Sequence, residues 1–242
     1  MSQQRFEQKR RQDRRRKLLR YVLPATMVVA GAGLLWLVVF SSVLAVSSVK
    51  VEGLDTLKAG QVREAAEVPD KRPLARLDTV AIEGRVGSME RVENVEVHRS
   101  WPSTVRIVVT ERRPVAWVRL DGRMRAIDRY GVDFKTYRRE PKTIVEVRFP
   151  GMDARRLQQS LSSAGSVLAA LRADDPALLK AVQHVEVESR DSVVLALSRG
   201  RTVTWGSAGR TAEKLTVLRS LLEAVDASGY DVSAPEQPTT KS

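Results

Sequence analysis

The stretch VEVHRSWPSTVRIVVTERRPVA, residues 95–116, decides the fold of the first half of this chain. Valine and isoleucine alternate with polar residues on both sides of Trp101-Pro102, which predicts two strands, 92–99 and 104–111, joined by a tight turn. Pro114 has no backbone N–H and cannot pair in a central strand, so the second strand should end before it. We therefore expect a hairpin here, followed by the start of another unit.

The residues before this hairpin predict one more strand and two helices. Residues 48–52 alternate and end at Gly53, as a short strand does. Apolar residues at helical spacing predict helices over about 59–67 and about 78–87, and Asp78 is the expected N-cap of the second. The predicted order is strand, helix, helix, strand, strand.

An uncharged stretch separates Arg20 from Lys50, and most of it is apolar. About 20 apolar residues are enough to cross a hydrocarbon core of about 30 Å, so residues 21–45 are predicted to form a transmembrane helix. Val43-Leu44-Ala45 offers small residues at a spacing suited to signal cleavage, but the stretch is longer than a signal peptide needs. We therefore expect an uncleaved anchor.

The tail before this stretch, residues 1–20, carries nine lysines and arginines against two acidic residues. Short basic flanks stay in the cytoplasm, so the N-terminus should be cytoplasmic and the C-terminal domains extracytoplasmic. A basic tail is also typical of a nucleic-acid-binding arm. Its position directly before a span favours a topology signal and anionic lipid instead.

The composition argues against an enzyme. The chain has no cysteine and only His98 and His184, which leaves little material for a transition-metal site or for a nucleophile with a histidine base. Ser207 lies in a glycine-rich turn, but Trp205 stands where the first glycine of G-x-S-x-G belongs. Carboxylates such as Asp128 are plentiful, so an acid pair stays open. We expect no enzymatic activity, no cofactor and no metal.

The second half predicts a different unit, in which short strands predominate. Asp121-Gly122 is a hairpin signal, leucines at helical spacing predict helices near 157–171 and from about Thr211, and residues 230–234 predict a final strand. Together the chain is predicted to be α+β. Its expected parts are the basic tail, the transmembrane helix, a β-α-α-β-β unit at 46–116, a mainly antiparallel β domain with flanking helices at 117–236, and a polar C-terminal tail at 237–242.

The strand order and its flanking residues resemble the POTRA domain of the FtsQ/DivIB cell-division family. The resemblance rests on V-x-V-x-G, R-x-W-P-x-T and E-R-x-P-V-A, which here include Gly53, Arg99, Trp101, Pro102, Glu111, Arg112 and Pro114. Turn and cap residues usually serve the fold, so we interpret these seven as mostly structural. Residues 199–206, 213–215 and 231–235 resemble the C-terminal domain of the same family.

The resemblance implies a non-enzymatic, single-pass type II scaffold of the cell membrane, located at the division septum. Family members bind the bitopic proteins FtsB and FtsL and, through them, control septal peptidoglycan synthesis. Neither nucleic acid nor a small-molecule substrate is an expected partner.

In the family, strands near the C-terminal end receive a partner segment, and the matching positions here are Tyr230, Asp231, Val232, Ser233 and Ala234. We expect them to form an exposed edge that pairs with the partner by strand addition. Pro235 and Pro238 follow at once, so a docking strand must end early. An ordinary last strand protected by a proline-bearing tail explains the same residues.

Two other classes of protein remain open from the sequence. One is a membrane-anchored POTRA chaperone or translocation component of the envelope, although such proteins usually carry several POTRA copies and one is found here. The other is a membrane-anchored enzyme that acts on the cell wall, which would need a carboxylate pair in a pocket.

Overall fold

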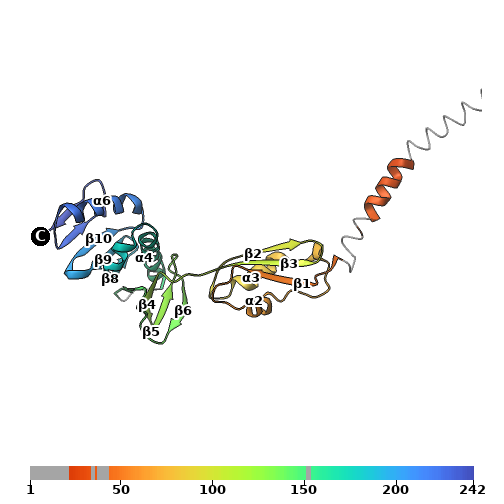
Figure 1. Cartoon of the computed structure of the whole chain (residues 1–242), viewed down its shortest axis with the longest axis horizontal. Helices are drawn as coiled ribbons and strands as arrows, with labels where there is room; N and C mark the ends of the chain where they lie inside the picture. The colour runs from red at the N-terminus through yellow and green to blue at the C-terminus, as the bar shows by residue number, and fades with distance from the viewer. Residues whose placement is uncertain (1–21, 34–35, 37–43, 151–153) are drawn as a thin grey trace, which may run out of the picture. The chain divides into compact units, whose positions relative to one another are not determined.

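The computed structural model describes residues 22–33, 36, 44–150 and 154–242 of the chain. Contacts divide the chain into two compact units, with the break between Thr110 and Glu111 (Figure 1). Glu111 and the residues after it therefore group with the second unit, whereas the boundary expected from the sequence lay after residue 116. The predicted basic tail, residues 1–20, lies outside the described residues.

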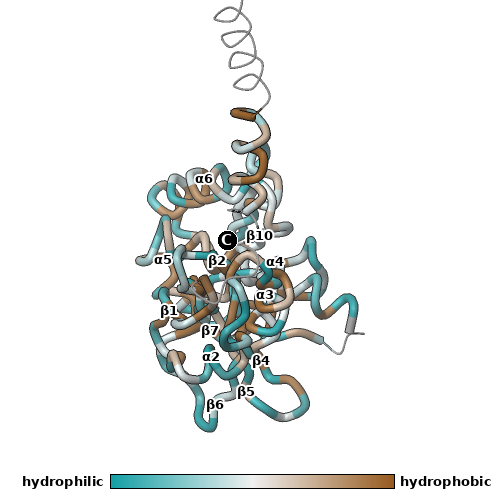
Figure 2. Tube along the Cα trace, turned by 90° about the vertical axis from the view of Figure 1, so that its right-hand side faces the viewer, coloured by the Kyte–Doolittle hydropathy of each residue, from teal (hydrophilic) through white to brown (hydrophobic). Residues whose placement is uncertain are grey.

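Residues 22–33 are helical, and Figure 2 colours much of this helix as hydrophobic. These residues are exposed. The exposed large apolar residues of this helix are Val22, Leu23, Met27, Val28 and Val29. Within the described ranges, no helix combines the length and the apolar character needed to cross a membrane. The predicted span also includes residues 34–35 and 37–43, which are outside the described part of the chain.

The first unit has the element order that the sequence predicts. Its elements are β1 (Ser48–Glu52), α2 (Ala59–Ala66), the short 3-10 helix η2 (Leu74–Arg76), α3 (Thr79–Gly87), β2 (Val92–Ser100) and β3 (Thr104–Glu111). β3 lies between β1 and β2, and β1 pairs with it in parallel. The Asp78 carboxylate accepts the Ala81 N–H at 3.0 Å, so this residue is the N-cap of α3 as predicted.

One face of this small sheet is buried under the two helices. Alternation along β3 buries Val105, Ile107 and Val109, which pack with Val62 of α2 and Ile82 of α3 in one apolar core. Burying each such side chain contributes about 1.5–3 kcal/mol. The period of two in the sequence therefore marks the buried face of the strand.

The second unit contains a nine-stranded mixed sheet. Its strands are β4 (Ala116–Leu120), β5 (Arg123–Ile127), β6 (Asp133–Tyr137), β7 (Val145–Arg148), β8 (Val182–Ser189), β9 (Ser192–Leu197), β10 (Thr202–Gly206), β11 (Gly229–Asp231) and β12 (Thr239–Lys241). They lie in the order β12-β11-β10-β9-β8-β7-β4-β5-β6. The pairs β4–β7, β7–β8 and β10–β11 are parallel and the other five are antiparallel.

Helices complete the core of this unit. They are α4 (Ala154–Asp174), α5 (Pro176–Ala181) and α6 (Thr211–Ala224), with a 3-10 turn, η3 (Ser198–Gly200), between β9 and β10. α4 packs against β8 and β9, and α6 lies beside β10 (Figure 1). The predicted leucine stripe of α4 is buried at Leu161, Leu168 and Leu171. The described elements of both units agree with the predicted α+β class.

The C-terminal end differs from the prediction in two respects. The strand expected at 230–234 is shorter, and it is an inner strand, because β11 pairs with β10 on one side and β12 on the other. The tail expected at 237–242 contains β12, which forms the edge of the sheet. Pro235 and Pro238 occupy the connection, where no ladder hydrogen bond is needed, so the chain can return antiparallel to β11.

Candidate partner-binding site

The five candidate docking residues divide into two groups in the structure. Tyr230 and Val232 are buried in the core, and the Val232 N–H donates to Thr204 O of β10 at 3.0 Å. The Tyr230 hydroxyl donates to Val225 O at 2.9 Å and accepts the Ala227 N–H at 3.1 Å. The side chains of Tyr230 and Val232 therefore hold this segment against the core and are not available at the surface.

The other three candidates face outward or lie beyond the strand. Asp231 is half-buried and accepts the Ser233 N–H at 2.9 Å, which turns the chain away from β10. Ser233 and Ala234 are exposed. Gly206 allows this close passage, because its φ is +73° and an added Cβ would lie 2.8 Å from the Ser233 Cβ.

A buried lysine holds the loop after β10. Lys214, on the first turn of α6, is only 1% exposed, and its Nζ donates to Trp205 O at 2.9 Å and Ser207 O at 2.8 Å. Burial lowers the pKa of Lys214, the nearby Arg210 charge lowers it further, and Asp231 opposes the shift. Lys214 therefore connects α6 to the loop that lies under Ser233.

This pKa shift predicts how stability depends on pH. Because the pKa of Lys214 is lower in the folded state, the unfolded state binds more protons. The free energy of unfolding should therefore rise as the pH increases towards 10.5, the ordinary pKa of lysine. We expect wild type to gain stability over Lys214→Met as the pH rises towards 10.5. Urea unfolding followed by tryptophan fluorescence measures the difference, because Trp117 and Trp205 are both buried in this unit. The matched control is Lys180→Met, which replaces a lysine at an exposed position. A flat Lys214 difference would show that the pKa is not lowered.

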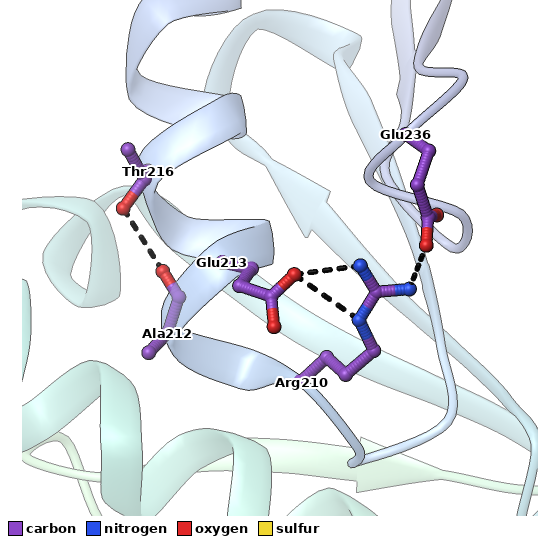
Figure 3. A network of polar contacts seen from close by, with 5 residues as sticks. All are labelled: Arg210, Ala212, Glu213, Thr216 and Glu236. Atoms are coloured by element: carbon purple, nitrogen blue, oxygen red, sulfur yellow. Dashed lines mark hydrogen bonds and ion pairs between the residues drawn. The ribbon is translucent and has the colours of Figure 1, made fainter.

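An exposed arginine links the C-terminal segment to the start of α6 (Figure 3). Arg210 donates to one carboxylate oxygen of Glu213, from Nη2 at 2.6 Å and from Nε at 3.1 Å, and its Nη1 pairs with Glu236. Both carboxylates raise the pKa of Arg210, and the hydrogen bonds to Glu213 have the larger effect. The pKa of Glu213 is lowered by the Arg210 hydrogen bonds, and that of Glu236 by a backbone hydrogen bond and then by Arg210.

The POTRA signature residues of the first unit lie at turns and caps. Gly53 has φ +81°, and an added Cβ would overlap the Val109 carbonyl oxygen, so only glycine fits there. Arg99 donates from Nη2 to Leu77 O at 2.6 Å. Trp101, joined to Pro102 by a cis peptide bond, is 53% exposed in the turn after β2.

The remaining signature residues begin the second unit. Arg112 Nη1 lies 2.5 Å from the Asp128 carboxylate, which is fully buried and also accepts the N–H groups of Tyr130 and Val132 at 2.9 Å. Pro114 O accepts a hydrogen bond from Arg172 Nη1 of α4 at 2.6 Å. Glu111 is the last residue of β3. Arg112 thus links the start of this unit to its core through Asp128, and Pro114 links it to α4 through Arg172.

The structure does not bring all the sequence-predicted residues together. Gly53, Arg99, Trp101 and Pro102 belong to one unit, and residues 230–234 belong to the other. Each histidine lies beside a glutamate on its own strand, and no group of three His, Asp or Glu side chains in the described ranges is arranged to hold a metal ion. Sequence reasoning named Lys214 only as part of the resemblance and missed its burial, and it missed the Arg210–Glu236 pair and β12. Two β-branched residues, Thr239-Thr240, are the only local signal for that strand.

Comparison with known proteins gives a likeness that runs through both units. Residues 44–112 match the family described as POTRA domain, FtsQ-type, and residues 116–234 match Cell division protein FtsQ/DivIB, C-terminal. The chain is 42% identical over 236 residues to Cell division protein FtsQ of Streptomyces bingchenggensis, which covers 93% of this chain and 86% of that one. It is 34% identical over 237 residues to Cell division protein FtsQ of Streptomyces coelicolor, with 90% and 86% covered. The protein of the same name from Mycobacteroides abscessus is 34% identical over 225 residues, with 93% and 69% covered.

Proposed function

The chain belongs to the FtsQ/DivIB family of cell division proteins, and from that membership we propose that it is a bitopic scaffold of the divisome. The proposed role is to help assemble and control septal peptidoglycan synthesis, with no catalytic step of its own. The observation that carries the proposal is the likeness over 93% of the chain, with the POTRA unit and the C-terminal unit in the same order.

The proposal includes a single-pass type II anchor in the cell membrane. Two observations support it: the uncharged stretch between Arg20 and Lys50, and the exposed apolar side chains on the described helix 22–33. The basic tail supports a cytoplasmic N-terminus, since short basic flanks stay inside. Both folded units would then work outside the cytoplasm.

The proposal also includes FtsB/FtsL-type bitopic proteins as partners, bound at the C-terminal edge of the sheet in the second unit. β11 and β12 form this edge, and β12 has no neighbouring strand on its outer side among the described residues. An exposed edge offers backbone hydrogen bonds to an incoming strand. That geometry supports strand addition as the binding mode.

Imaging of dividing cells tests the proposed function. We expect a fluorescent protein fused to the N-terminus to form a midcell band during constriction, and depletion of the chain to give long or branched cells that do not divide. A matched fusion that carries only residues 1–47, the tail and the predicted anchor, should spread evenly over the cell periphery. An even peripheral signal from the full chain, with normal division on depletion, would contradict the proposal.

A further inference from the structure

We propose that one end of the first unit rests on the outer surface of the cell membrane, where Trp101 enters the headgroup layer and Lys71 and Arg72 bind the phosphates of anionic phospholipids. This inference rests on the proposed single-pass anchor and adds a second contact between the chain and the bilayer. The surface consists of residues 45–47, 70–73 and 101–103. It is called the entry end below, because the chain enters the folded unit there.

The loop before η2 holds the first residues of the unit. The Val46 N–H donates to Arg72 O at 2.9 Å, and the Lys71 N–H donates to Val46 O at 3.3 Å. Ala45 forms an isolated antiparallel bridge with Pro73. Ala45 and Val46 are buried, so their side chains already belong to the folded unit. The chain is therefore fixed from residue 45 onwards, and Lys71 and Arg72 lie where it enters the unit.

The turn that carries Trp101 lies at the same end. The Ser47 N–H donates to Ser103 O at 2.9 Å, and the hydroxyl of Ser47 donates to that of Ser103 at 2.8 Å. Ser48 then pairs with Thr104, where β1 and β3 begin side by side (Figure 1). The turn from Trp101 to Ser103 is thus bonded directly to the second residue after the predicted anchor.

The length of chain available keeps the entry end close to the bilayer. Residue 45 ends the predicted anchor, and two extended residues after it span at most about 7 Å. The headgroup region on each side of the hydrocarbon core is roughly 5–8 Å thick. Since Val46 and Ser47 are both bonded to the unit, they leave no free linker. The turn and the loop cannot move away from the headgroups without breaking those bonds.

Trp101 has the exposure and the chemistry of a residue at a membrane interface. Of the four tryptophans, Trp36 lies in the predicted anchor, and Trp117 and Trp205 are buried. Trp101 is 53% exposed, so the core of its unit does not need most of the indole surface. An indole ring has a large apolar area and one polar N–H, which makes tryptophan favourable at the level of the headgroups. An exposed tryptophan beside the predicted anchor therefore fits lipid better than water.

Two cations supply an attraction to lipid at the same end. Lys71 and Arg72 are exposed, and Asp70 is the one acidic residue of the entry end. In the described part of the chain, neither cation is paired with a carboxylate. Each basic residue near an anionic bilayer surface strengthens binding about fivefold, so the two together supply about 25-fold. This attraction falls off within about 8–10 Å, so it depends on the short connection to the anchor. The ligand class is therefore an anionic phospholipid headgroup.

Quenching of tryptophan emission by brominated lipids tests the position of Trp101 in the full-length chain in nanodiscs. Trp36→Phe removes the emission of the predicted anchor, and Trp36→Phe with Trp101→Leu is the matched control. The difference between these two variants is the emission of Trp101. We expect bromine near the headgroup end of the acyl chain to quench this emission more strongly than bromine at the bilayer centre. Trp117 and Trp205 remain in the control and should not be quenched, because both are buried.

The charge of the lipid tests the two cations. In nanodiscs that contain phosphatidylglycerol, Lys71→Gln with Arg72→Gln should lower the docked fraction of the entry end about threefold, if wild type is docked about nine-tenths of the time. The quenching of Trp101 measures that fraction. Phosphatidylcholine alone should lower the quenching of the unsubstituted loop in the same way.

The first unit offers a matched control for the charge. Lys58→Gln with Arg91→Gln removes two positive charges from the same unit. Arg91 directly precedes β2 and is separated from the turn of the entry end by the whole of that strand, and Lys58 is separated from the loop by α2. Because the field of an exposed charge is screened within about 8–10 Å, this variant should leave the quenching of Trp101 unchanged.

The anchor and the entry end can fail separately in these experiments. The difference between wild type and Trp36→Phe reports whether Trp36 is in lipid. Quenching of Trp36 without quenching of Trp101 would overturn the lipid contact and leave the proposed function standing. Quenching of neither would overturn the proposed anchor as well. Quenching of Trp101 that depends neither on phosphatidylglycerol nor on Lys71 and Arg72 would overturn the assignment to anionic headgroups.

Discussion

Arg112→Met is expected to lower the free energy of unfolding of the second unit by about 3–5 kcal/mol. The reason is the Asp128 carboxylate, which is 0% exposed and has Arg112 as its countercharge at 2.5 Å. Methionine replaces the aliphatic part of the arginine but leaves the carboxylate buried without a positive charge. Urea unfolding followed by tryptophan fluorescence measures the effect, because Trp117 and Trp205 are both buried in this unit.

The chain offers a matched control at the next position. Arg113 is exposed, so Arg113→Met removes the same charge one residue away and should change stability by no more than about 0.5 kcal/mol. A loss for Arg112→Met that is as small as the control would contradict the assigned role of this ion pair. Arg112 would then contribute no more to stability than a surface arginine, although its side chain is only 17% exposed.

Asp128→Asn tests the buried charge separately from the hydrogen bonds that hold the turn. Asparagine keeps an oxygen for the N–H groups of Tyr130 and Val132 but removes the buried negative charge. The double variant Arg112→Met with Asp128→Asn should therefore be more stable than Arg112→Met alone, because no uncompensated charge remains. The coupling energy from this double-mutant cycle is the interaction between the two side chains.

Alternation and helical spacing allowed much of the fold to be predicted. Val105, Ile107 and Val109 face one core, and the Leu161, Leu168 and Leu171 stripe faces another, so burial itself imposes the period that the sequence shows. β12 lacks such a period because none of its side chains is buried. A strand held by backbone pairing alone leaves only weak propensity in the sequence.

The candidate site was harder to predict, because its contacts join residues that are far apart in the chain. The Asp121-Gly122 signal does predict the β4–β5 hairpin, whose register sets Ala116 opposite Ile127 and so brings the Arg112 region near Asp128. No local pattern marks Lys214 as buried or Glu236 as the partner of Arg210, since both depend on how α6 meets the C-terminal segment. The docking residues were chosen by family resemblance, which does not say which strand forms the edge.

Gly131→Ala is expected to lower the free energy of unfolding of the second unit by about 2–5 kcal/mol. Gly131 closes the turn that begins at Asp128, with φ +74°, and its N–H donates to Asp128 O at 3.0 Å. Alanine is strained in the left-handed conformation, and its Cβ would also overlap the backbone of α4 at Leu161 and Ser162. Because that backbone belongs to a long packed helix, it cannot shift to make room as a flexible side chain would.

Gly122→Ala separates these two costs within the same unit. Gly122 has φ +73°, nearly the same as Gly131, but an added Cβ would meet no atom within 4 Å. It should cost only the left-handed conformation, about 1–2 kcal/mol. The extra loss at Gly131, measured by the same tryptophan fluorescence, is then the energy of forcing the turn away from α4. Equal losses for the two alanine variants would mean that the turn is not held against the helix. The same turn approaches α4 at Gly165, where an added Cβ would lie 2.5 Å from Asp128 O, and that approach would then impose no constraint either.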